Sequence, residues 1–405
     1  MAASRSISER DGWAVLASVA GVGPVALARL LDHFGTACAA LDVASSPGAI
    51  ERLTEVGTER EGDGSVRRAI NPALAHAIAD AAQRADAILA RIRGLGLEVV
   101  TVEEPVYPHR LGRIELPPHV LFVRGDPAAL DPARAIAIVG TRRPTFGGRR
   151  ISSRISAAVA KAGATVVSGL AVGIDGEAHQ ATIDAGGVTV AVIGSGHANL
   201  FPRVHERLAQ RIVDRGGAVV SELAPDDAPT KGTFPRRNRV VSGLSDATIV
   251  VEAPARSGAL ITASWALEQG RECFLVPGPI DAAASEGCLA FLREYPDAAR
   301  IVSGIPQLLD DLGLVDRETA ATIVAAPDAE AALLEVGGTA ARIGRELVEG
   351  RTTVDELVAV TGQPVATVLT ALTLLESRGL AAAAYGRYRP AGSLAARPPR
   401  PRRRS

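Results

Sequence analysis

The stretch AIAIVGTRR, residues 135–143, opens the part of the chain that decides the fold. It is a short, apolar, β-branched run that breaks at Gly140. Further runs of the same kind follow: TVVS (165–168), VTVAVI (188–193), AVVS (218–221), ATIVV (247–251) and ECFLV (272–276). Helical-looking segments separate them, which is the pattern of βαβ units around a buried parallel sheet. The sequence therefore predicts an α/β fold built on a parallel sheet.

Polar and glycine-containing segments follow four of these runs. The segments are GTRR after Val139, SGLAVGID after Val167, GSGHANLFP after Ile193 and EAPARSGALITA after Val251. In an open α/β sheet such loops gather at the carboxyl edge of the strands, where ligands bind. Glycine allows backbone amides to approach an anion closely, and helix N-termini add a favourable dipole. We therefore expect a site for phosphate-bearing ligands at this edge.

The composition suits a chain of two or three domains without a strong overall charge. It has 405 residues, of which 47% are hydrophobic and 3% aromatic, and its formal net charge is −1. Alanine, valine, leucine and isoleucine must therefore build the core. Any attraction to nucleic acid has to come from a local basic patch, because the chain as a whole is nearly neutral.

Two features of the sequence favour a cytoplasmic protein with no membrane partner. Cys38, Cys273 and Cys288 are far apart and lack CxxC spacing, which argues against disulfides and zinc. No apolar run approaches the roughly 18 residues of a membrane span, and the N-terminus lacks the apolar core of a signal peptide.

The N-terminal part reads as helical, in the manner of a small SAM-like domain. A turn, GVGP (21–24), lies between two helical segments and resembles a helix-hairpin-helix motif, whose amides grip DNA phosphates. An ordinary turn between packed helices explains the same residues at least as well. The charged segment 55–65 is expected to be a loop, and Leu74–Ile92 a further helix.

The C-terminal part predicts three helices and a short hairpin, the pattern of a winged helix-turn-helix. The third helix, within 363–380, carries VATVLTALTLLE and lacks the Arg, Asn and Gln side chains that read bases. We therefore favour protein contact over DNA binding for this unit. The tail has five arginines and no acid, which favours disorder and non-specific phosphate attraction. The predicted boundaries are 1–100 (helical domain), 101–303 (sheet domain), 304–338 (linker), 339–390 (winged-helix-like domain) and 391–405 (basic disordered tail).

A basic cluster, KGTFPRRNR, lies between two of the ligand-edge loops. Single-strand binders use such an arrangement, since cations follow the backbone while a base stacks on an aromatic ring. A solvated helix face is the alternative interpretation of a basic run. Because this run lies between two ligand-edge loops, DNA binding and a solvated face are equally plausible. The residues concerned are Lys231, Phe234, Arg236, Arg237, Asn238 and Arg239, together with Arg142 and Arg143 after the first strand.

Several long motifs occur together in one order, and they resemble the DprA/Smf family of DNA-processing proteins. They are IAIVGTRRPTFG, VVSGLAVGIDGEAH, FPRRNRVVSGLSD, VVEAPARSGALITASWALEQGR and FLVPGPI, with YPHRL upstream. The resemblance covers residues 107–278, and the winged-helix-like unit fits the same layout. It implies a Rossmann-like domain that binds and protects single-stranded DNA, forms homodimers and helps to load the RecA recombinase in natural transformation and recombination. It implies no enzymatic activity, no cofactor and no metal.

The resemblance also implies particular site residues. The DNA-binding arginine of the family's G-[ST]-R motif falls on Arg142, and the lysine and aromatic of its KxxF motif fall on Lys231 and Phe234. Further DNA-binding positions are Gly140, Thr141, Ser168, Gly169, Arg236, Arg237, Asn238, Arg239, Ser257 and Gly258. The chain departs from the pattern at Leu289, where an asparagine is usual, and at Val172, where an arginine is common.

An enzymatic alternative stays open. PARSGALITASWALEQ resembles the PGGxGTxxE segment of phosphoribohydrolases with a lysine-decarboxylase-like fold, which cleave nucleoside monophosphates. Glu252 or Glu268 would then be an acid–base group and Arg239 a phosphate clamp. An ion pair between Glu252 and an arginine is the simpler interpretation.

Other ligand classes are disfavoured. Asp175, Glu177 and His179 invite a metal, but the histidines lack HxxxH spacing and Asp175 suits a helix cap. GSG at 194–196 lacks the third glycine of a dinucleotide turn, and Gx4GK[ST] is absent from the sequence, so neither NAD binding nor ATP hydrolysis is expected.

Overall fold

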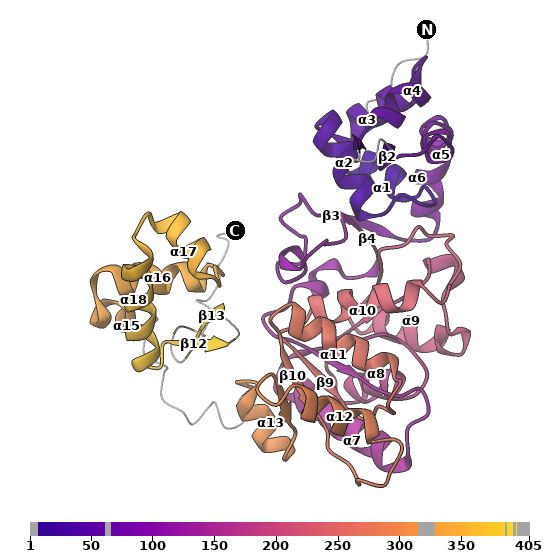
Figure 1. The fold of residues 1–405 in the computed structure, drawn as a ribbon. Helices are drawn as coiled ribbons and strands as arrows, with labels where there is room; N and C mark the ends of the chain where they lie inside the picture. The colour runs from indigo at the N-terminus through magenta and orange to yellow at the C-terminus, as the bar shows by residue number, and fades with distance from the viewer. Residues whose placement is uncertain (1–6, 61–65, 315–328, 385–386, 392–393, 395–405) are drawn as a thin grey trace, which may run out of the picture. The chain divides into compact units, whose positions relative to one another are not determined.

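The computed structural model describes residues 7–60, 66–314, 329–384, 387–391 and 394. The chain forms two compact units, Met1–Val315 and Asp316–Ser405. Each unit is described by itself below (Figure 1).

A nine-stranded sheet organises the first unit. Neighbouring strands are parallel from β11 to β8, and β4 runs antiparallel to both β8 and β3. The predicted parallel, Rossmann-like sheet is therefore confirmed, with an antiparallel pair added at one edge. In order across the sheet the strands are β11 (Ala299–Ile301), β10 (Glu272–Leu275), β9 (Ala247–Val250), β5 (Ala135–Val139), β6 (Thr165–Ser168), β7 (Thr189–Val192), β8 (Ala218–Ser221), β4 (Val120–Gly125) and β3 (Glu98–Thr101).

Helices cover both faces of this sheet, because its strands are apolar on both sides. One face packs against α10 (Thr233–Gly243), α11 (Gly258–Glu268) and α12 (Glu286–Glu294). The other packs against α7 (Phe146–Lys161), α8 (Ile174–Asp184), α9 (Glu206–Asp214) and α13 (Ile305–Asp311). Val139 and Val250 point to the first face, and Ile138 and Ile249 to the second. All three cysteines are free, as expected.

The N-terminal part is helical, as predicted, and shares one core with β4 through Val120 and Phe122. Two details differ from the prediction. The predicted loop at 55–65 contains the strand β1, which pairs with β2 just after the loop. The predicted helix Leu74–Ile92 is two helices, since Arg84 leaves helical geometry. The elements are α1 (Glu9–Ala17), α2 (Pro24–Phe34), α3 (Ala37–Ala44), α4 (Ala49–Glu55), β1 (Thr58–Arg60), β2 (Val66–Arg68), α5 (Pro72–Gln83) and α6 (Ala85–Gly94).

The structure moves two predicted domain boundaries. The boundary at 100/101 cuts β3, which pairs with β4 and belongs to the large sheet. The segment predicted as a linker from residue 304 begins with α13, and Leu308, Leu312 and Leu314 are buried against the sheet. Apolar burial therefore extends the first unit to the end of this helix, and at the other end Leu333 is buried in the second unit.

The second unit has the three helices and the hairpin expected of a winged-helix-like domain, preceded by one further helix, Ala329–Val336. Its core holds Ile343, Leu357, Leu372 and Leu375, one or two from each of the three expected helices. Its elements are α15 (Ala329–Val336), α16 (Gly338–Val348), α17 (Val354–Thr361), α18 (Val365–Ser377), β12 (Ala381–Ala384) and β13 (Arg387–Pro390). The predicted basic tail, 391–405, lies almost wholly outside the described residues.

Among the described residues, no single helix is long and apolar enough to cross a membrane. Only α17 and α18 taken together have the required length and composition, and they are bent by 114° relative to each other.

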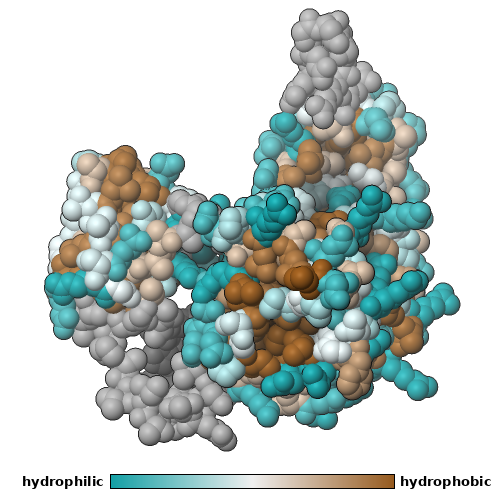
Figure 2. Space-filling view, turned by 60° about the horizontal axis from the view of Figure 1, so that its bottom comes forward, coloured by the Kyte–Doolittle hydropathy of each residue, from teal (hydrophilic) through white to brown (hydrophobic). Residues whose placement is uncertain are grey.

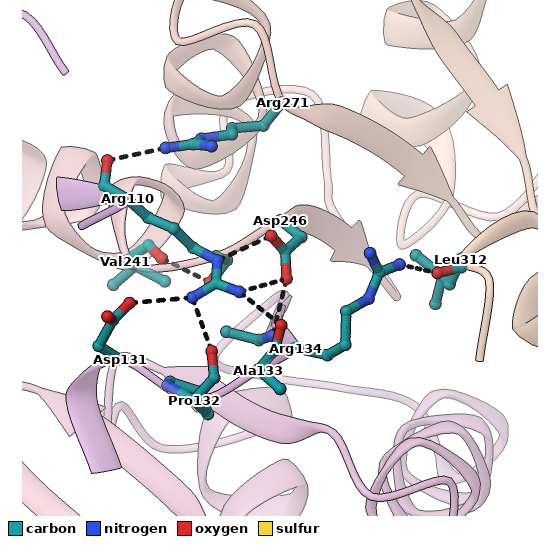
Figure 3. Close-up of polar contacts among 11 residues, drawn as sticks. Arg110, Asp131, Pro132, Ala133, Arg134, Val241, Asp246, Arg271 and Leu312 are labelled. Atoms are coloured by element: carbon teal, nitrogen blue, oxygen red, sulfur yellow. Dashed lines mark hydrogen bonds and ion pairs between the residues drawn. The ribbon is translucent and has the colours of Figure 1, made fainter. Parts of the chain in front are cut away.

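The YPHRL segment supplies an arginine that ties the segment between β3 and β4 to the start of β5 (Figure 3). Arg110 Nε donates to Asp246 Oδ1 at 2.7 Å and Nη2 to Asp246 Oδ2 at 3.1 Å. Its Nη1 donates to the carbonyl of Pro132 at 2.8 Å and to Asp131 Oδ1 at 3.2 Å. Asp246 Oδ2 also accepts from the backbone amide of Ala135 at 2.9 Å. This pair thereby fixes the start of β5.

We predict that Arg110→Ala destabilises the first unit by roughly 2–3 kcal/mol, because it leaves a half-buried carboxylate without its charged donor. Chemical denaturation followed by circular dichroism measures the change. Arg154→Ala, an exposed position on α7, is the matched control and should change stability by less than about 0.5 kcal/mol. Equal stability of the two variants would show that the Arg110 pair contributes nothing.

His179 of α8 is a fully buried histidine held by the sheet. Thr189 Oγ1 donates to the carbonyl of Val166 at 2.7 Å, so it must accept from His179 Nδ1, 2.7 Å away. Burial, together with the charges of nearby His205 and Arg237, lowers the pKa of His179 to about 3. The imidazole is therefore neutral in the folded chain at physiological pH.

This histidine should make the fold sensitive to acid. Below its ordinary pKa of about 6.5 the unfolded chain takes up a proton that the folded chain refuses, so stability falls as pH falls from about 7 toward 3. His197, whose pKa burial lowers to about 4, contributes in the same direction. We predict that His179→Asn, which keeps a donor to Thr189, reduces the loss of unfolding free energy on acidification by up to about 1.4 kcal/mol per pH unit. Unfolding at pH 7, 6 and 5 measures it, and an unchanged slope would contradict it.

Candidate nucleic-acid interface

A cavity of about 750 Å³ opens at the carboxyl edge of the sheet. It lies where the strand order reverses, since β5 continues to β6 on one side while β9 lies on the other. Crevices at such switch points are the usual ligand sites of open α/β sheets. Of the predicted residues, those that line the cavity are Gly140, Thr141, Arg142, Lys231, Phe234, Arg237, Asn238, Ser257 and Gly258, and Arg143 lines it too.

Phe234 and Arg142 form the aromatic and cationic part of the wall. The guanidinium carbon of Arg142 lies 5.4 Å from the centre of the Phe234 ring. Thr233 Oγ1 donates to the carbonyl of Gly194 at 2.7 Å and so fixes the first turn of α10 on the loop after β7. A Cβ at Gly194 would lie 2.9 Å from the Phe234 ring, so this glycine makes room for the ring. The GSG segment therefore serves the wall.

Arg237 is the buried cation of the cavity. Its side chain lies over Gly169, where a Cβ would stand 1.6 Å from Nη1, so only glycine fits there. Burial lowers the pKa of Arg237 to about 10, while the negative charge of Asp175 opposes this effect, so Arg237 stays protonated at neutral pH. Its Nε has no hydrogen-bond partner among the described residues. Arg237 therefore adds a buried positive charge to the cavity wall.

Asp175 sets the geometry beneath Arg237. Burial raises the pKa of its carboxyl, whereas the Arg237 charge and the amides of Ala171, Gly169 and Gly140 lower it. The amide of Gly169 donates to Asp175 Oδ2 at 3.2 Å. The predicted role of Asp175 as a cap is thus replaced by a link between the loops after β5 and β6.

Four predicted site residues lie outside the cavity lining, and one of them is Gly169, beneath the Arg237 side chain. Arg239 is 7% exposed and forms an ion pair with buried Glu222, so it is no phosphate contact of this cavity. Arg236 lines a separate hollow beside Gly23 of the GVGP turn. Ser168 is buried and donates to the carbonyl of Ile138 at 2.6 Å. Arg236 and Arg239 point away from the cavity because neighbouring residues of a helix, here α10, point in different directions.

The start of α11 forms the opposite wall. Ser257 caps this helix, since its side chain accepts from the amide of Ala259. Asn238 Nδ2 donates to the carbonyl of Gly258 at 3.0 Å and so joins α10 to α11. No side chain covers the space beside Gly258. The helix N-terminus is therefore open to a negatively charged group.

The residues of the enzymatic alternative lie outside the cavity lining. Glu252 accepts from the amide of Thr145 at 2.9 Å and from its hydroxyl, in place of the ion pair expected from the sequence. Glu268 is the last residue of α11, at the end away from the cavity. Neither carboxylate faces the space where a nucleotide would sit.

The metal candidates have other partners. Glu177 accepts from the hydroxyl of Ser153, His179 donates to Thr189, and Asp175 accepts backbone amides. Across the residues that the structure describes, no group of three His, Cys, Asp or Glu side chains could hold a metal ion.

The structure adds functional candidates to those predicted. Arg256, in the loop after β9, lines the cavity beside Ser257, and its place in the ligand-edge segment EAPARSG is the signal that could have identified it. Phe201 lies against Phe234, with 5.8 Å between ring centres. Phe201 belongs to the ligand-edge segment GSGHANLFP, and its place there is the signal that could have identified it. Of the two departures, Val172 is a partly exposed neighbour of cavity-lining Ala171, and Leu289 lies within α12.

Comparison with known proteins agrees with this architecture. The family described as DNA recombination-mediator protein A matches residues 98–313. Protein Smf of Escherichia coli (strain K12) is 39% identical over 293 residues, which cover 72% of this chain and 76% of that protein. Protein Smf of Synechocystis sp. is 32% identical, covering 92% of this chain and 96% of that protein.

A solved structure extends the likeness to the fold. The X-ray structure of DNA processing protein A (DprA) from Streptococcus pneumoniae superposes with a TM-score of 0.60 at 29% identity, covering 76% of this chain and 98% of that chain. The family match includes every strand of the large sheet, the helix α13 that follows it and all cavity-lining residues. The chain therefore belongs to the DNA recombination-mediator protein A family, the DprA/Smf DNA-processing proteins.

Proposed function

We propose that this chain binds single-stranded DNA in the carboxyl-edge cavity and acts without catalysing a reaction. The observation that carries the proposal is the ring of Phe234 in a wall of cations, with Arg142 against it and Lys231 in the same lining. Cations that follow a backbone and a ring on which a base stacks are the combination that single-strand binding requires.

Further groups of the cavity suit the same ligand. Arg143, Arg237 and Arg256 add positive charge, and the uncovered start of α11 adds a favourable dipole. Five cationic side chains in one lining exceed what one monophosphate requires. A nucleic-acid strand with several phosphates uses them better.

We further propose that the bound strand is handed to a RecA-type recombinase during transformation or recombination, and that the chain protects it meanwhile. The support is the family resemblance. The same source supports a homodimer, to which the surface adds an observation. Figure 2 shows an apolar area, in brown, on the forward face of the first unit. Phe146 and Ile280 of this unit are 82% and 94% exposed.

The first test separates charge from stacking. If Arg142, Lys231 and Arg256 each neutralise a phosphate, alanine at each should flatten the plot of log affinity against log salt by about 0.7. Phe234→Leu should instead lower affinity by about 1–3 kcal/mol and leave that slope intact. Fluorescence anisotropy with a labelled single strand across a salt series measures both.

The matched control for the charge variants is Lys161→Ala. This cation ends α7, at the opposite edge of the sheet, and should alter neither affinity nor salt slope. Charge variants that behave like Lys161→Ala, with the fold intact, would remove the DNA from this cavity.

A second test addresses the hydrolase. We expect no free base when the protein is incubated with nucleoside monophosphates, because Glu252 is held by Thr145. Chromatography of the reaction mixture measures the base. Free adenine that rises with protein concentration and is lost in Glu252→Gln would establish the phosphoribohydrolase instead.

A third test divides the chain between its two units. Because Leu312 and Leu314 belong to the core of the first unit, a chain cut after Val315 should fold, whereas a cut after Asp311 exposes the sheet. We expect the chain ending at Val315 to keep most of its single-strand affinity and its effect on the recombinase. Filament growth on strands coated by single-strand-binding protein measures the second property. Normal DNA binding without faster filament growth would place the recombinase surface on the second unit.

A further inference from the structure

Phe201 is an aromatic side chain left partly in solvent at the rim of the cavity. It is 44% exposed, in a chain that has only seven phenylalanines. Phe122, Phe274 and Phe291 are buried in the core. The ring of Phe201 lies 5.8 Å from that of Phe234, tilted by 55°, and outside the cavity lining. A ligand that covers this ring would gain roughly 25 cal/mol for each Å² of apolar area that it removes from water.

The loop that carries Phe201 is held in place from two sides. The short 3-10 helix η4 (Arg203–His205) follows it, and His205 Nδ1 lies 2.8 Å from the carbonyl of Leu170, in the loop after β6. A Cβ at Gly176 would lie 2.5 Å from the His205 ring, so the ring packs closely against the start of α8. The position of Phe201 is therefore built by the sheet edge.

The surroundings of Phe201 continue the chemistry of the cavity. Arg142 and Phe201 both contact the Phe234 ring, the first through its guanidinium and the second through its own ring. Arg203 is exposed two residues after Phe201, and Val204 is 72% exposed. A ring with an exposed cation nearby offers a base and its phosphate the same pair of contacts that the cavity offers.

We propose that Phe201 is a second base-stacking platform, which extends the DNA site beyond the cavity by one nucleotide along the rim. This inference rests on the proposed single-strand binding at Phe234. The occupant is the base next to the one on Phe234, and recognition is by the face of the ring, so it is indifferent to sequence.

The experiment compares two ligands of equal length and charge: an oligothymidylate and the same strand with every base removed. Their affinity ratio reports base contacts alone, whatever register the strand adopts. It is measured for the full chain, Phe201→Leu, Phe234→Leu and the double variant. Leucine keeps apolar packing but has no aromatic face. Val204→Ala is the control for a general change of the rim. We expect Phe201→Leu to lower the ratio about five-fold or more, in the wild-type and Phe234→Leu backgrounds alike, and Val204→Ala to leave it unchanged.

The other outcomes are decisive. If Phe201→Leu lowers the ratio only while Phe234 is present, Phe201 merely supports Phe234, and the second platform does not exist. The same conclusion follows if Phe201→Leu has no effect, or if Val204→Ala has an equal one. If the full chain does not bind oligothymidylate, or binds both strands equally, the proposed base stacking at Phe234 fails first, which these measurements distinguish from a failure at Phe201.

Discussion

One buried carboxylate, that of Asp175, holds the ligand edge of this protein together. The amides of Gly140, Gly169 and Ala171 are hydrogen-bonded to it, so a single side chain joins the ends of β5 and β6. Its negative charge also offsets the burial of Arg237, which would otherwise be an uncompensated cation in the protein interior. Burying the charge of Asp175 or of Arg237 alone would be unfavourable, and the two opposite charges near the same switch point offset this effect. The charge and the shape of the cavity thus depend on the same few atoms.

Two glycines of the edge serve side chains more directly than they serve an anion. Gly169 leaves the space that Arg237 fills, and Gly194 leaves the space beside Phe234. The glycine-rich loops therefore let α10 press a cation and a ring onto the ends of the strands. Glycine at a ligand edge usually indicates a phosphate-binding site. Here it also allows the side chains that line the cavity to pack closely.

The sequence was most informative where apolar pattern and local chemistry coincide. The β-branched runs predicted the parallel strands β5 to β10, and the motifs brought Arg142, Lys231 and Phe234 to one cavity. The sequence was least informative about the direction in which each side chain points. A run of basic residues does not show which face of α10 each occupies, so Arg239 was misassigned although its partner, Glu222, stands in the same sequence. Phe201 contacts Phe234 only because the sheet brings their loops together. Strand β3 was not predicted, because its four residues follow a helix and are too few to show a strand periodicity.

Strand β5 is anchored at both ends by acids: Asp246 receives the amide of Ala135 at its start, and Asp175 receives that of Gly140 just after its last residue. The backbone of Thr141 is fixed in turn by a bond to the carbonyl of Glu252 at 2.7 Å. The wall that presents Arg142 is thus rigid before any ligand arrives. Little conformational entropy is then lost by the protein on binding, and the ordering that binding demands falls on the flexible strand. If a single strand binds here as proposed, a preformed wall favours a polymer that can bend to fit it.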